Sequence, residues 1–302
     1  MSKITVVIPT YNQSEYLSDC IDSVLAQTRK PDQIIVVDDR STDNTTSVIK
    51  KYQNKVKYIR HEKNLGPVKT FNDCLRRAKG DYILMVSGDD WLEKNIIETE
   101  AGFLDRHPDI AMVFAQSYTV ENNKKKLIIN QNAGNISYTS RDDEYKKLLI
   151  SGNYIDYLTA MVRSKVYNKL GYWDEKLPYL HDYEMWIRIG SKYKIAYIAQ
   201  PLANYRIHRS NLHKKVGRLV SYQDEFSYIL RKYLKRSTDI KLKNKAYYYF
   251  YISLVIKNFS EHKITNGKKY WVRAIKSMPF FLFKWTTWQP FYFLVREFFI
   301  KF

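Results

Sequence analysis

The sequence predicts an α/β fold in which a mainly parallel sheet is flanked by helices. Over the first 115 residues, short apolar runs alternate with amphipathic stretches, and a polar cluster follows each of several apolar runs. Apolar runs of this length are typical of parallel strands buried on both faces, as in βαβ units. Because ligands of open α/β sheets bind beyond the carboxyl ends of the strands, the polar clusters should meet in one crevice.

The elements follow from these patterns in chain order. Strands are expected at residues 4–8, 33–38, 56–60, 82–86 and 110–115, with helices at 14–26, 42–52 and 68–78 between them. In the first helix, Leu17, Ile21 and Val24 recur at helical spacing on one face. Residues 120–135 form a polar hairpin or surface loop, residues 183–189 look helical, and the pattern is helical throughout after about residue 211. The chain therefore divides into a domain over 1–215 and a helical extension over 216–302.

The charge of the chain is uneven. Its 302 residues carry a net charge of +19, and residues 214–302 hold 19 Lys and Arg against 5 Asp and Glu. This asymmetry indicates a polyanionic partner, either nucleic acid or an anionic membrane surface. The sequence has no recognised zinc spacing, RNA-recognition signature or basic helix, which argues against nucleic acid.

The cysteines and the amino terminus point to a reducing compartment. Cys20 and Cys74 both fall in expected helices, and two thiols make no disulfide framework. Only five apolar residues precede Pro9, too few for the apolar region of a signal peptide. Because no run of about 18 apolar residues occurs, a spanning helix is not expected. We expect buried thiols in a cytoplasmic protein.

The first acidic cluster follows the second strand, in the segment DDRSTDNT. Crowded carboxylates repel one another, so they are tolerated where they bind a cation, meet a ligand or cap a helix. Ser41 or Thr42 as an N-cap, with Asp43 in the first turn, is the structural alternative. Capping leaves Asp38 and Asp39 at the strand end, facing the crevice.

The second acidic cluster, Ser87-Gly88-Asp89-Asp90, follows the apolar run 82–86. Adjacent carboxylates beside a glycine suit Mg²⁺ or Mn²⁺ that bridges two phosphates. A turn with an N-cap is the alternative. The repetition of an acidic cluster at a neighbouring strand favours the metal.

Two later segments complete the candidate residues. Asp182 begins a short helix, where it is either an N-cap or a general base. Arg206 and His208 place a cation and an imidazole close together. A lone histidine by itself is weak evidence for a site.

Taken together, seven motifs resemble those of family 2 glycosyltransferases with the GT-A fold, and they occur in the same order. They are VVIPTYN (6–12), VVDDRSTDNT (36–45), NLGPVKTFN (64–72), GDYILMVSGDDW (80–91), GYWDEKL (171–177), LHDYEMWIRI (180–189) and YRIHRSN (205–211). The resemblance covers about residues 1–215. It implies a GT-A-type, Rossmann-like mixed sheet flanked by helices, with the C-terminal helical extension outside it.

The resemblance also implies roles for residues at matching positions. The nucleotide would be bound by Pro9, Thr10, Tyr11, Asp38, Asp39, Asn64 and Gly66, and the donor sugar or diphosphate by Lys69, Gly88, Arg206 and His208. Asp89, Asp90 and His208 would hold the metal, and Asp182 would be the catalytic base. Acceptor specificity should lie in residues 151–157 and 173–181, where Trp173 and His181 would face the acceptor. Two positions depart from the family pattern: Ser87 replaces the usual leading aspartate, and His181 replaces a common acid.

The implied activity is metal-dependent, inverting sugar transfer in bacterial surface-polysaccharide synthesis, of the lipopolysaccharide O-antigen kind. The donor would be a nucleotide-sugar, with UDP the implied nucleotide, and the cofactor Mn²⁺ or Mg²⁺. The acceptor would be a hydroxyl of a glycan or an undecaprenyl-linked oligosaccharide. One carboxylate base opposite the leaving group implies a single displacement.

The last 24 residues are rich in aromatic side chains interleaved with Lys284, Arg296 and Lys301. Such a segment suits the headgroup region of an anionic bilayer. A helical hairpin that packs its rings on the main domain is the alternative. The membrane prediction places the protein peripherally on the inner face of the cell membrane.

The sequence lacks the loops that two rival enzyme classes would require. A dinucleotide oxidoreductase would carry G-x-G-x-x-G after the first strand, where Ile-Pro-Thr-Tyr-Asn stands instead. A sugar-phosphate nucleotidyltransferase would need a glycine-rich, basic loop at the same place to hold a triphosphate.

Overall fold

The computed structural model describes residues 1–122, 124–128, 136–139, 141–211, 218–235, 237–260 and 263–277. The chain divides into two compact units. The first comprises residues 1–145 and 153–225, and the second comprises residues 146–152 and the chain from residue 226 onward. The first unit holds the sheet, and the described part of the second is helical.

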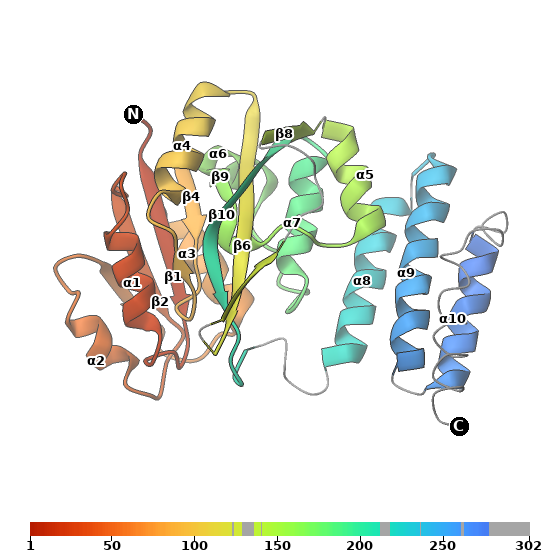
Figure 1. Ribbon diagram of the computed structural model, residues 1–302, viewed down its shortest axis with the longest axis horizontal. Coiled ribbons are helices and arrows are strands. Elements are labelled where there is room, and N and C mark those ends of the chain that lie inside the picture. Colours follow the sequence, from red (N-terminus) through yellow and green to blue (C-terminus); the bar gives the residue numbers. More distant parts are fainter. Residues whose placement is uncertain are drawn as a thin grey trace. The chain divides into compact units, whose positions relative to one another are not determined.

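Within the described residues of the first unit, one mixed sheet runs in the order β3-β2-β1-β4-β9-β6-β10-β5, while β7 pairs with β6 and β8 with β10 (Figure 1). The strands are β1 (Ile4–Thr10), β2 (Gln33–Asp38), β3 (Lys57–Arg60), β4 (Tyr82–Met85), β5 (Trp91–Leu92), β6 (Ile110–Glu121), β7 (Lys124–Ile128), β8 (Ile136–Thr139), β9 (Met161–Arg163) and β10 (Lys194–Arg206). β1 to β4 are mutually parallel.

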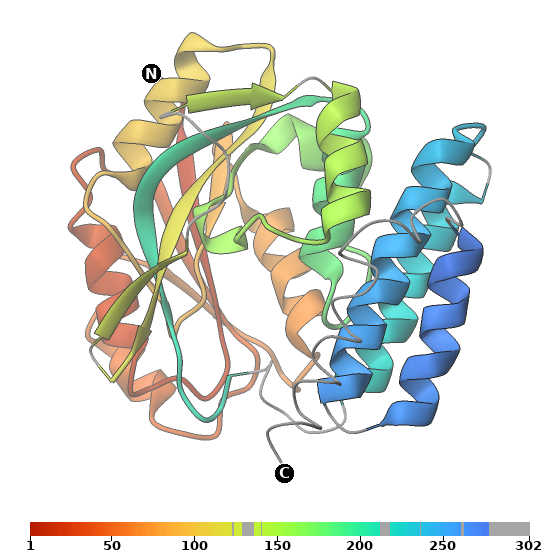
Figure 2. The same ribbon diagram turned by 45° about the vertical axis from the view of Figure 1, so that its right-hand side comes forward.

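Helices cover both faces of this sheet. They are α1 (Leu17–Leu25), α2 (Thr45–Lys50), α3 (Pro67–Arg77), α4 (Ile96–Arg106), α6 (Ser164–Leu170) and α7 (His181–Gly190), with the 3₁₀ turn η1 (Tyr157–Thr159). α5 (Arg141–Ser151) begins in the first unit and ends in the second. α1 and α4 lie on one face, and α3 and α7 on the other (Figures 1 and 2). Every residue of β1 is buried, so this central strand is covered from both sides.

The parallel half of the fold confirms the sequence prediction. All four parallel strands form where apolar runs predicted them, and α1 and α3 form between them. Two details were wrong. α2 begins at Thr45 rather than at residue 42, and neither Ser41 nor Thr42 caps it, because Asp43 Oδ1 accepts the Thr45 amide hydrogen bond at 3.0 Å. The strand expected at 110–115 continues to Glu121 as β6, whereas its hairpin with β7 agrees with the hairpin or surface loop expected over 120–135.

The antiparallel and late strands position the site. β9 pairs antiparallel with both β4 and β6, and so joins the two halves of the sheet. β10 runs parallel to β6 and antiparallel to β5, with Asn204 opposite Trp91. This pairing brings the end of β10 beside the turn that holds Asp89 and Asp90.

A buried carboxyl group in α4 yields a stability prediction. Glu100 is 0% exposed, and neither of its carboxyl oxygens has a hydrogen-bond partner within the described structure. Burial raises the pKa of Glu100 well above its ordinary value. The folded chain therefore keeps this proton to a higher pH than the unfolded chain, whose glutamate titrates near roughly 4.3. Stability contributed by the protonated form is lost as pH rises above that value.

We expect Glu100→Leu to raise the free energy of unfolding at pH 8 by about 1–3 kcal/mol, because it removes an unpaired buried polar group. The gain should shrink toward pH 4. Glu98→Leu, an exposed position on the same helix, is the control and should leave the pH dependence unchanged. Denaturant unfolding between pH 4 and 8 measures both, and equal pH profiles for wild type and Glu100→Leu would contradict the prediction.

The second unit contains most of α8 (Arg218–Leu234) together with α9 (Ile240–Ser260) and α10 (Ile264–Ser277). Phe226 of α8 stacks on Phe250 of α9 with ring centroids 4.9 Å apart. Tyr248 and Ala274, from α9 and α10, share a small buried cluster. None of the helices in the described part of the chain is both long enough and apolar enough to cross a membrane. Residues 279–302, for which a membrane contact was predicted, lie outside the described residues.

Candidate active site

The carboxyl end of β1 joins the two acidic clusters. The Asp39 amide donates to the Thr10 carbonyl at 2.9 Å, and the Gly88 amide donates to the Pro9 carbonyl at 3.1 Å. Pro9 and Thr10 are buried, whereas Tyr11 is 44% exposed just beyond the strand. The clusters expected from the sequence therefore lie on either side of one strand end.

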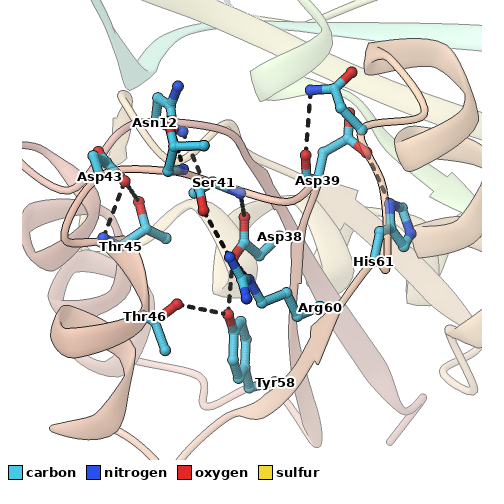
Figure 3. A network of polar contacts seen from close by, with 12 residues as sticks. Asn12, Asp38, Asp39, Ser41, Asp43, Thr45, Thr46, Tyr58, Arg60 and His61 are labelled. Carbon is cyan, nitrogen blue, oxygen red and sulfur yellow. Dashed lines mark hydrogen bonds and ion pairs between the residues drawn. The ribbon is translucent and has the colours of Figure 1, made fainter.

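Asp38 is fully buried, and its carboxylate is occupied by the protein (Figure 3). Oδ1 accepts the Ser41 amide at 2.8 Å, and Oδ2 accepts the Tyr58 hydroxyl at 2.8 Å. Arg60 Nε lies 3.3 Å from Oδ2. These contacts show how the crowded acids are tolerated: the charge of Asp38 is compensated by a cation and two donors, and it holds the loop after β2 against β3.

Asp39 fixes the loop that precedes α3. Its carboxylate accepts the amides of Leu65 at 2.7 Å and Gly66 at 2.9 Å, and Asn64 donates to its carbonyl oxygen at 3.2 Å. Gly66 has φ of +86°, a conformation that favours glycine. Asp39, Asn64 and Gly66, all expected to bind the nucleotide, are thus brought together. Lys69, expected near the donor sugar or diphosphate, is exposed on α3.

The sequence analysis missed His61, which supports Asp39. His61 Nδ1 lies 2.9 Å from Asp39 Oδ1 (Figure 3). Its Nε2 lies 3.2 Å from Asp73 Oδ2 on α3. The imidazole therefore ties the acidic pair to a helix. Its position directly after β3, at the same sheet edge as the acids, is the signal that could have identified it.

The second acidic cluster meets the end of β10. Asp89 Oδ2 lies 2.9 Å from His208 Nε2, and Asp90 Oδ1 accepts the Arg206 amide at 2.8 Å. Asp90 Oδ2 is buried without a hydrogen-bond partner in the described structure. Burial, and then the neighbouring Asp89 carboxylate, raise the pKa of Asp90 well above its ordinary value. Asp89, Asp90, Arg206 and His208 thus form one group, as the sequence predicted.

This group fits a cation only together with other ligands. Across the residues that the structure describes, no three His, Cys, Asp or Glu side chains are placed to hold a metal ion. The 2.9 Å between Asp89 Oδ2 and His208 Nε2 is about the separation of two neighbouring ligands on an ion with bonds of roughly 2.1 Å. Mg²⁺ is commonly bound through one or two carboxylates and completes its shell with substrate phosphates and water. Asp89 supplies one such carboxylate, and His208 would add an imidazole nitrogen as a second ligand.

Ser87, which stands at the leading position of the cluster, is bonded to the Tyr157 hydroxyl through its own hydroxyl oxygen. Its carbonyl oxygen accepts from Cys20 Sγ at 3.4 Å. Cys20 and Cys74 are both buried and free of disulfides, as the sequence predicted. The serine therefore links the acidic turn to η1 rather than adding a carboxylate to the site.

Gly88 packs so closely that a side chain would displace its neighbours. A Cβ here would lie 2.8 Å from both Thr10 Oγ1 and Gln13 Oε1. We expect Gly88→Ala to lower the free energy of unfolding by about 1–3 kcal/mol, as overpacking does. Gly102→Ala is the matched control, because its nearest atom would be Arg106 Nη1 at 3.5 Å, and in α4 it should stabilise by roughly 0.5–1 kcal/mol. Thermal unfolding measures the direction of both changes in stability. If Gly88→Ala left the stability unchanged, this would contradict the close packing.

Asp182 lies in the first turn of α7, and both of its carboxylate oxygens are bonded. Oδ1 accepts the Tyr183 amide at 2.7 Å, and Oδ2 accepts the Asn153 side-chain amide at 2.8 Å. Leu180, rather than Asp182, is the N-cap residue of the helix. The Asn153 contact fixes the direction of the carboxylate.

A short loop, residues 153–157, connects the Asp182 end of the site to the acidic turn. Asn153 contacts Asp182, and Tyr157 contacts Ser87. Between them, Asp156 accepts the Ser117 hydroxyl at 2.7 Å. Burial is the main cause that raises the pKa of Asp156 to about 6, and the negative charge of Asp182 contributes to the same rise. Asp156 was not named as a site residue from the sequence, because an isolated aspartate belongs to no motif, but it lies within residues 151–157, where acceptor specificity was expected.

Trp173 and His181, expected at the acceptor side, are buried at 3% and 7% exposure. Their rings stack with centroids 4.7 Å apart, and both pack against Phe71 of α3. The Asn72 side chain pairs with the backbone amide and carbonyl of Trp173, each at 2.9 Å. The two rings are therefore packed against α3 beside the start of α7.

Known proteins share both the sequence pattern and the fold. The model of glycosyl transferase family 2 matches residues 5–171. An uncharacterized glycosyltransferase of Methanocaldococcus jannaschii is 32% identical over 269 residues, which cover 84% of this chain and 87% of that protein. TarS of Staphylococcus aureus, a poly(ribitol-phosphate) β-N-acetylglucosaminyltransferase, is 37% identical over 112 residues, covering 35% of this chain and 20% of TarS.

Two solved structures show the same architecture. Residues 1–349 of TarS in complex with UDP-GlcNAc match with a TM-score of 0.60 and 18% identity, covering 91% of each chain. A mannosyltransferase of Pyrobaculum calidifontis in complex with GDP-Man and Mn²⁺ matches with a TM-score of 0.59 and 15% identity, covering 91% of this chain and 75% of that one. These matches confirm the expected GT-A-type mixed sheet. The family model spans more than half of this sequence, and the match to the Methanocaldococcus jannaschii protein covers 84% of it. The chain therefore belongs to glycosyl transferase family 2.

Proposed function

We propose that this glycosyltransferase moves a sugar from a UDP-sugar to a hydroxyl of a glycan or undecaprenyl-linked acceptor, with inversion, in bacterial surface-polysaccharide synthesis of the O-antigen kind. One observation carries the proposal. Asp89, Arg206 and His208 meet beside the carboxyl end of β1, and Asp39 is hydrogen-bonded to the same strand end. The UDP-GlcNAc complex of TarS, and the poly(ribitol-phosphate) β-N-acetylglucosaminyltransferase activity of that relative, support a UDP-sugar donor and a polymer acceptor.

The nucleotide would bind around the end of β1. Pro9 and Thr10 form the floor, and the exposed ring of Tyr11 is free to stack on a base. The loop from Asn64 to Gly66, held by Asp39, forms the adjoining wall. In this proposal Asp38 acts indirectly, by holding the loop that follows it.

The diphosphate would lie beside the second acidic cluster. Asp89 and His208 would hold Mn²⁺ or Mg²⁺, with Asp90 behind them, and Gly88 and Lys69 near the phosphates. A bound metal would neutralise the charge that develops on the departing diphosphate. Arg206 adds a fixed cation to the same place, because its Nε is anchored on the Asp89 carbonyl at 2.9 Å.

Asp182 would remove the proton from the acceptor hydroxyl as it attacks the anomeric carbon. Asn153 orients the carboxylate, and the rings of Trp173 and His181 pack beside the start of its helix. Asp156, between this base and the acidic turn, would face the sugars. A single base opposite the leaving group gives one displacement, and hence inversion.

The C-terminal part would hold the enzyme on the inner face of the cell membrane. Residues 214–302 carry 19 Lys and Arg against 5 Asp and Glu, and anionic lipid attracts each basic residue near the surface by about 1 kcal/mol. We expect the full chain to float with vesicles that contain phosphatidylglycerol but not with neutral ones. A chain that ends near Lys276 should float less, and equal flotation of the two would exclude a role for the last residues.

One experiment tests the central proposal. The protein is incubated with a panel of UDP-, GDP- and dTDP-sugars, with Mn²⁺ or with EDTA, and thermal unfolding and nucleotide release are recorded. We expect one UDP-sugar to stabilise the fold in a metal-dependent manner and to be slowly hydrolysed. Stabilisation by GDP- or dTDP-sugars instead would overturn the UDP assignment.

A further inference from the structure

The guanidinium of Arg206 is held in place before any ligand arrives. It lies between two aromatic rings, 4.8 Å from the centroid of Tyr16 and 4.5 Å from that of Trp91. Its Nε donates to the Asp89 carbonyl at 2.9 Å, and its side chain is 21% exposed. Stacking fixes the plane of a guanidinium, so this group loses little freedom when it binds an anion.

The other recorded hydrogen-bond partner of this guanidinium is an exposed carboxylate, that of Asp19. Nη2 donates to Asp19 Oδ2 at 2.7 Å, and the Asp19 side chain, in the first turn of α1, is 62% exposed. In the described part of the chain, no other hydrogen bond or ion pair is recorded for this carboxylate. An ion pair with so exposed a partner contributes about 0–1 kcal/mol. A more highly charged anion can therefore replace the carboxylate at low cost.

We propose that Asp19 occupies the place on Arg206 that the diphosphate of the donor takes, and so competes with donor binding. The inference rests on the proposed function, which puts the diphosphate beside Asp89 and His208. A guanidinium presents five N–H donors in a fork that matches phosphate oxygens. Because the rings hold Arg206 and nothing else holds Asp19, the aspartate is the group that moves.

The surrounding charges strengthen the competition. The Arg206 guanidinium pairs with the carboxylate of Asp19 and with the backbone carbonyl of Asp89, so a diphosphate bound there would bring further negative charge beside Asp19. Like charges so close raise each other's energy. The ring of His208 packs against the same Tyr16, with centroids 4.8 Å apart, so Tyr16 supports both of the groups expected at the diphosphate.

The inference predicts a gain in affinity from removing a side chain. Pyrophosphate and UDP, each with Mg²⁺, are titrated calorimetrically into the wild type, Asp19→Asn, Asp19→Glu and Asp22→Asn. We expect Asp19→Asn to lower the Kd of both anions by about three- to tenfold. Asp22→Asn makes the same charge change at an exposed position of α1 and should stay within about twofold of wild type. Asp19→Glu, which keeps a carboxylate, should also stay close to wild type.

A second background separates direct competition from a general charge effect. In Arg206→Gln, the further change Asp19→Asn should leave the Kd of pyrophosphate unchanged, because the shared partner is gone. An equal gain with and without Arg206 would overturn the proposal, as would an unchanged or weaker affinity in Asp19→Asn alone. Thermal unfolding of each variant confirms that it is folded.

The two ligands distinguish this inference from the proposed function. If pyrophosphate binds more tightly to Asp19→Asn but no variant binds UDP, competition by Asp19 stands and the UDP-sugar proposal fails. If UDP binds equally well to wild type and Asp19→Asn, the donor proposal stands and the competition is wrong. Binding of neither ligand to any variant would overturn both.

Discussion

We expect Asp182→Asn to lower the turnover number by about 10²- to 10⁴-fold while the Kd of the donor nucleotide stays within about twofold, the range that loss of a general base produces. An asparagine keeps the size of the side chain but cannot take the proton of the acceptor hydroxyl. It also presents an NH₂ group to one of two donors, the Tyr183 amide or the Asn153 side chain. Calorimetric UDP binding and steady-state release of UDP with acceptor present separate the two quantities.

The control for this prediction is Asp109→Asn. Asp109 directly precedes β6, at the end of the strand away from the site, and its side chain is 57% exposed beside Lys194. It makes the same charge change and should leave turnover unchanged. If Asp182→Asn kept near-normal turnover, the base would have to be sought elsewhere, and Asp156 would be the first candidate, because its pKa is raised to about 6.

The parallel half of the fold was predictable because its signals are local. Each of the strands β1, β2 and β4 is a short apolar run whose residues are nearly all buried. The two acidic clusters follow such runs directly, so their place at the carboxyl edge of the sheet followed from general sheet geometry.

The other half depends on pairing partners that the local sequence does not reveal. β9 has three residues, too few for a periodicity, yet it joins β4 to β6. β10 shows register shifts on either side of Pro201, which interrupt the alternation expected of a strand. Residues 151–157 were expected to contribute to acceptor specificity, but because Asp156 acquires its environment from Ser117 and Asp182, each distant in sequence, no local pattern distinguished it within that segment.

For the acidic pair after β2, the sequence predicted the location in the sheet but not the hydrogen bonds that the two carboxylates accept. The sequence placed Asp38 and Asp39 at the strand end facing the crevice, free for a ligand. The structure places both at the strand end, but they are buried, and their oxygens accept hydrogen bonds from Ser41, Tyr58 and the loop before α3. Hydrogen-bond donors of the protein itself relieve the repulsion between these neighbouring carboxylates. Composition alone does not reveal such donors.

Asp89→Asn should have the other large effect, because it removes the more exposed acid of the pair that faces the proposed metal. We expect kcat/KM to fall by about 10²- to 10³-fold. An amide oxygen carries no charge and binds Mg²⁺ or Mn²⁺ more weakly than a carboxylate. His208, now 2.9 Å from Asp89 Oδ2, would be left as the nearest ligand.

Affinity for UDP in the presence and absence of Mn²⁺ gives a test that does not depend on turnover. In the wild type, Mn²⁺ should raise the affinity if Asp89 and His208 hold the ion, because a bound cation would offset the charge of the diphosphate. In Asp89→Asn this increase should disappear. Asp109→Asn, with the same loss of charge away from the site, should keep it. If Asp89→Asn retained the Mn²⁺ effect, then Asp89 and His208 would not hold the ion, and Arg206 would be left as the principal positive charge for the leaving diphosphate.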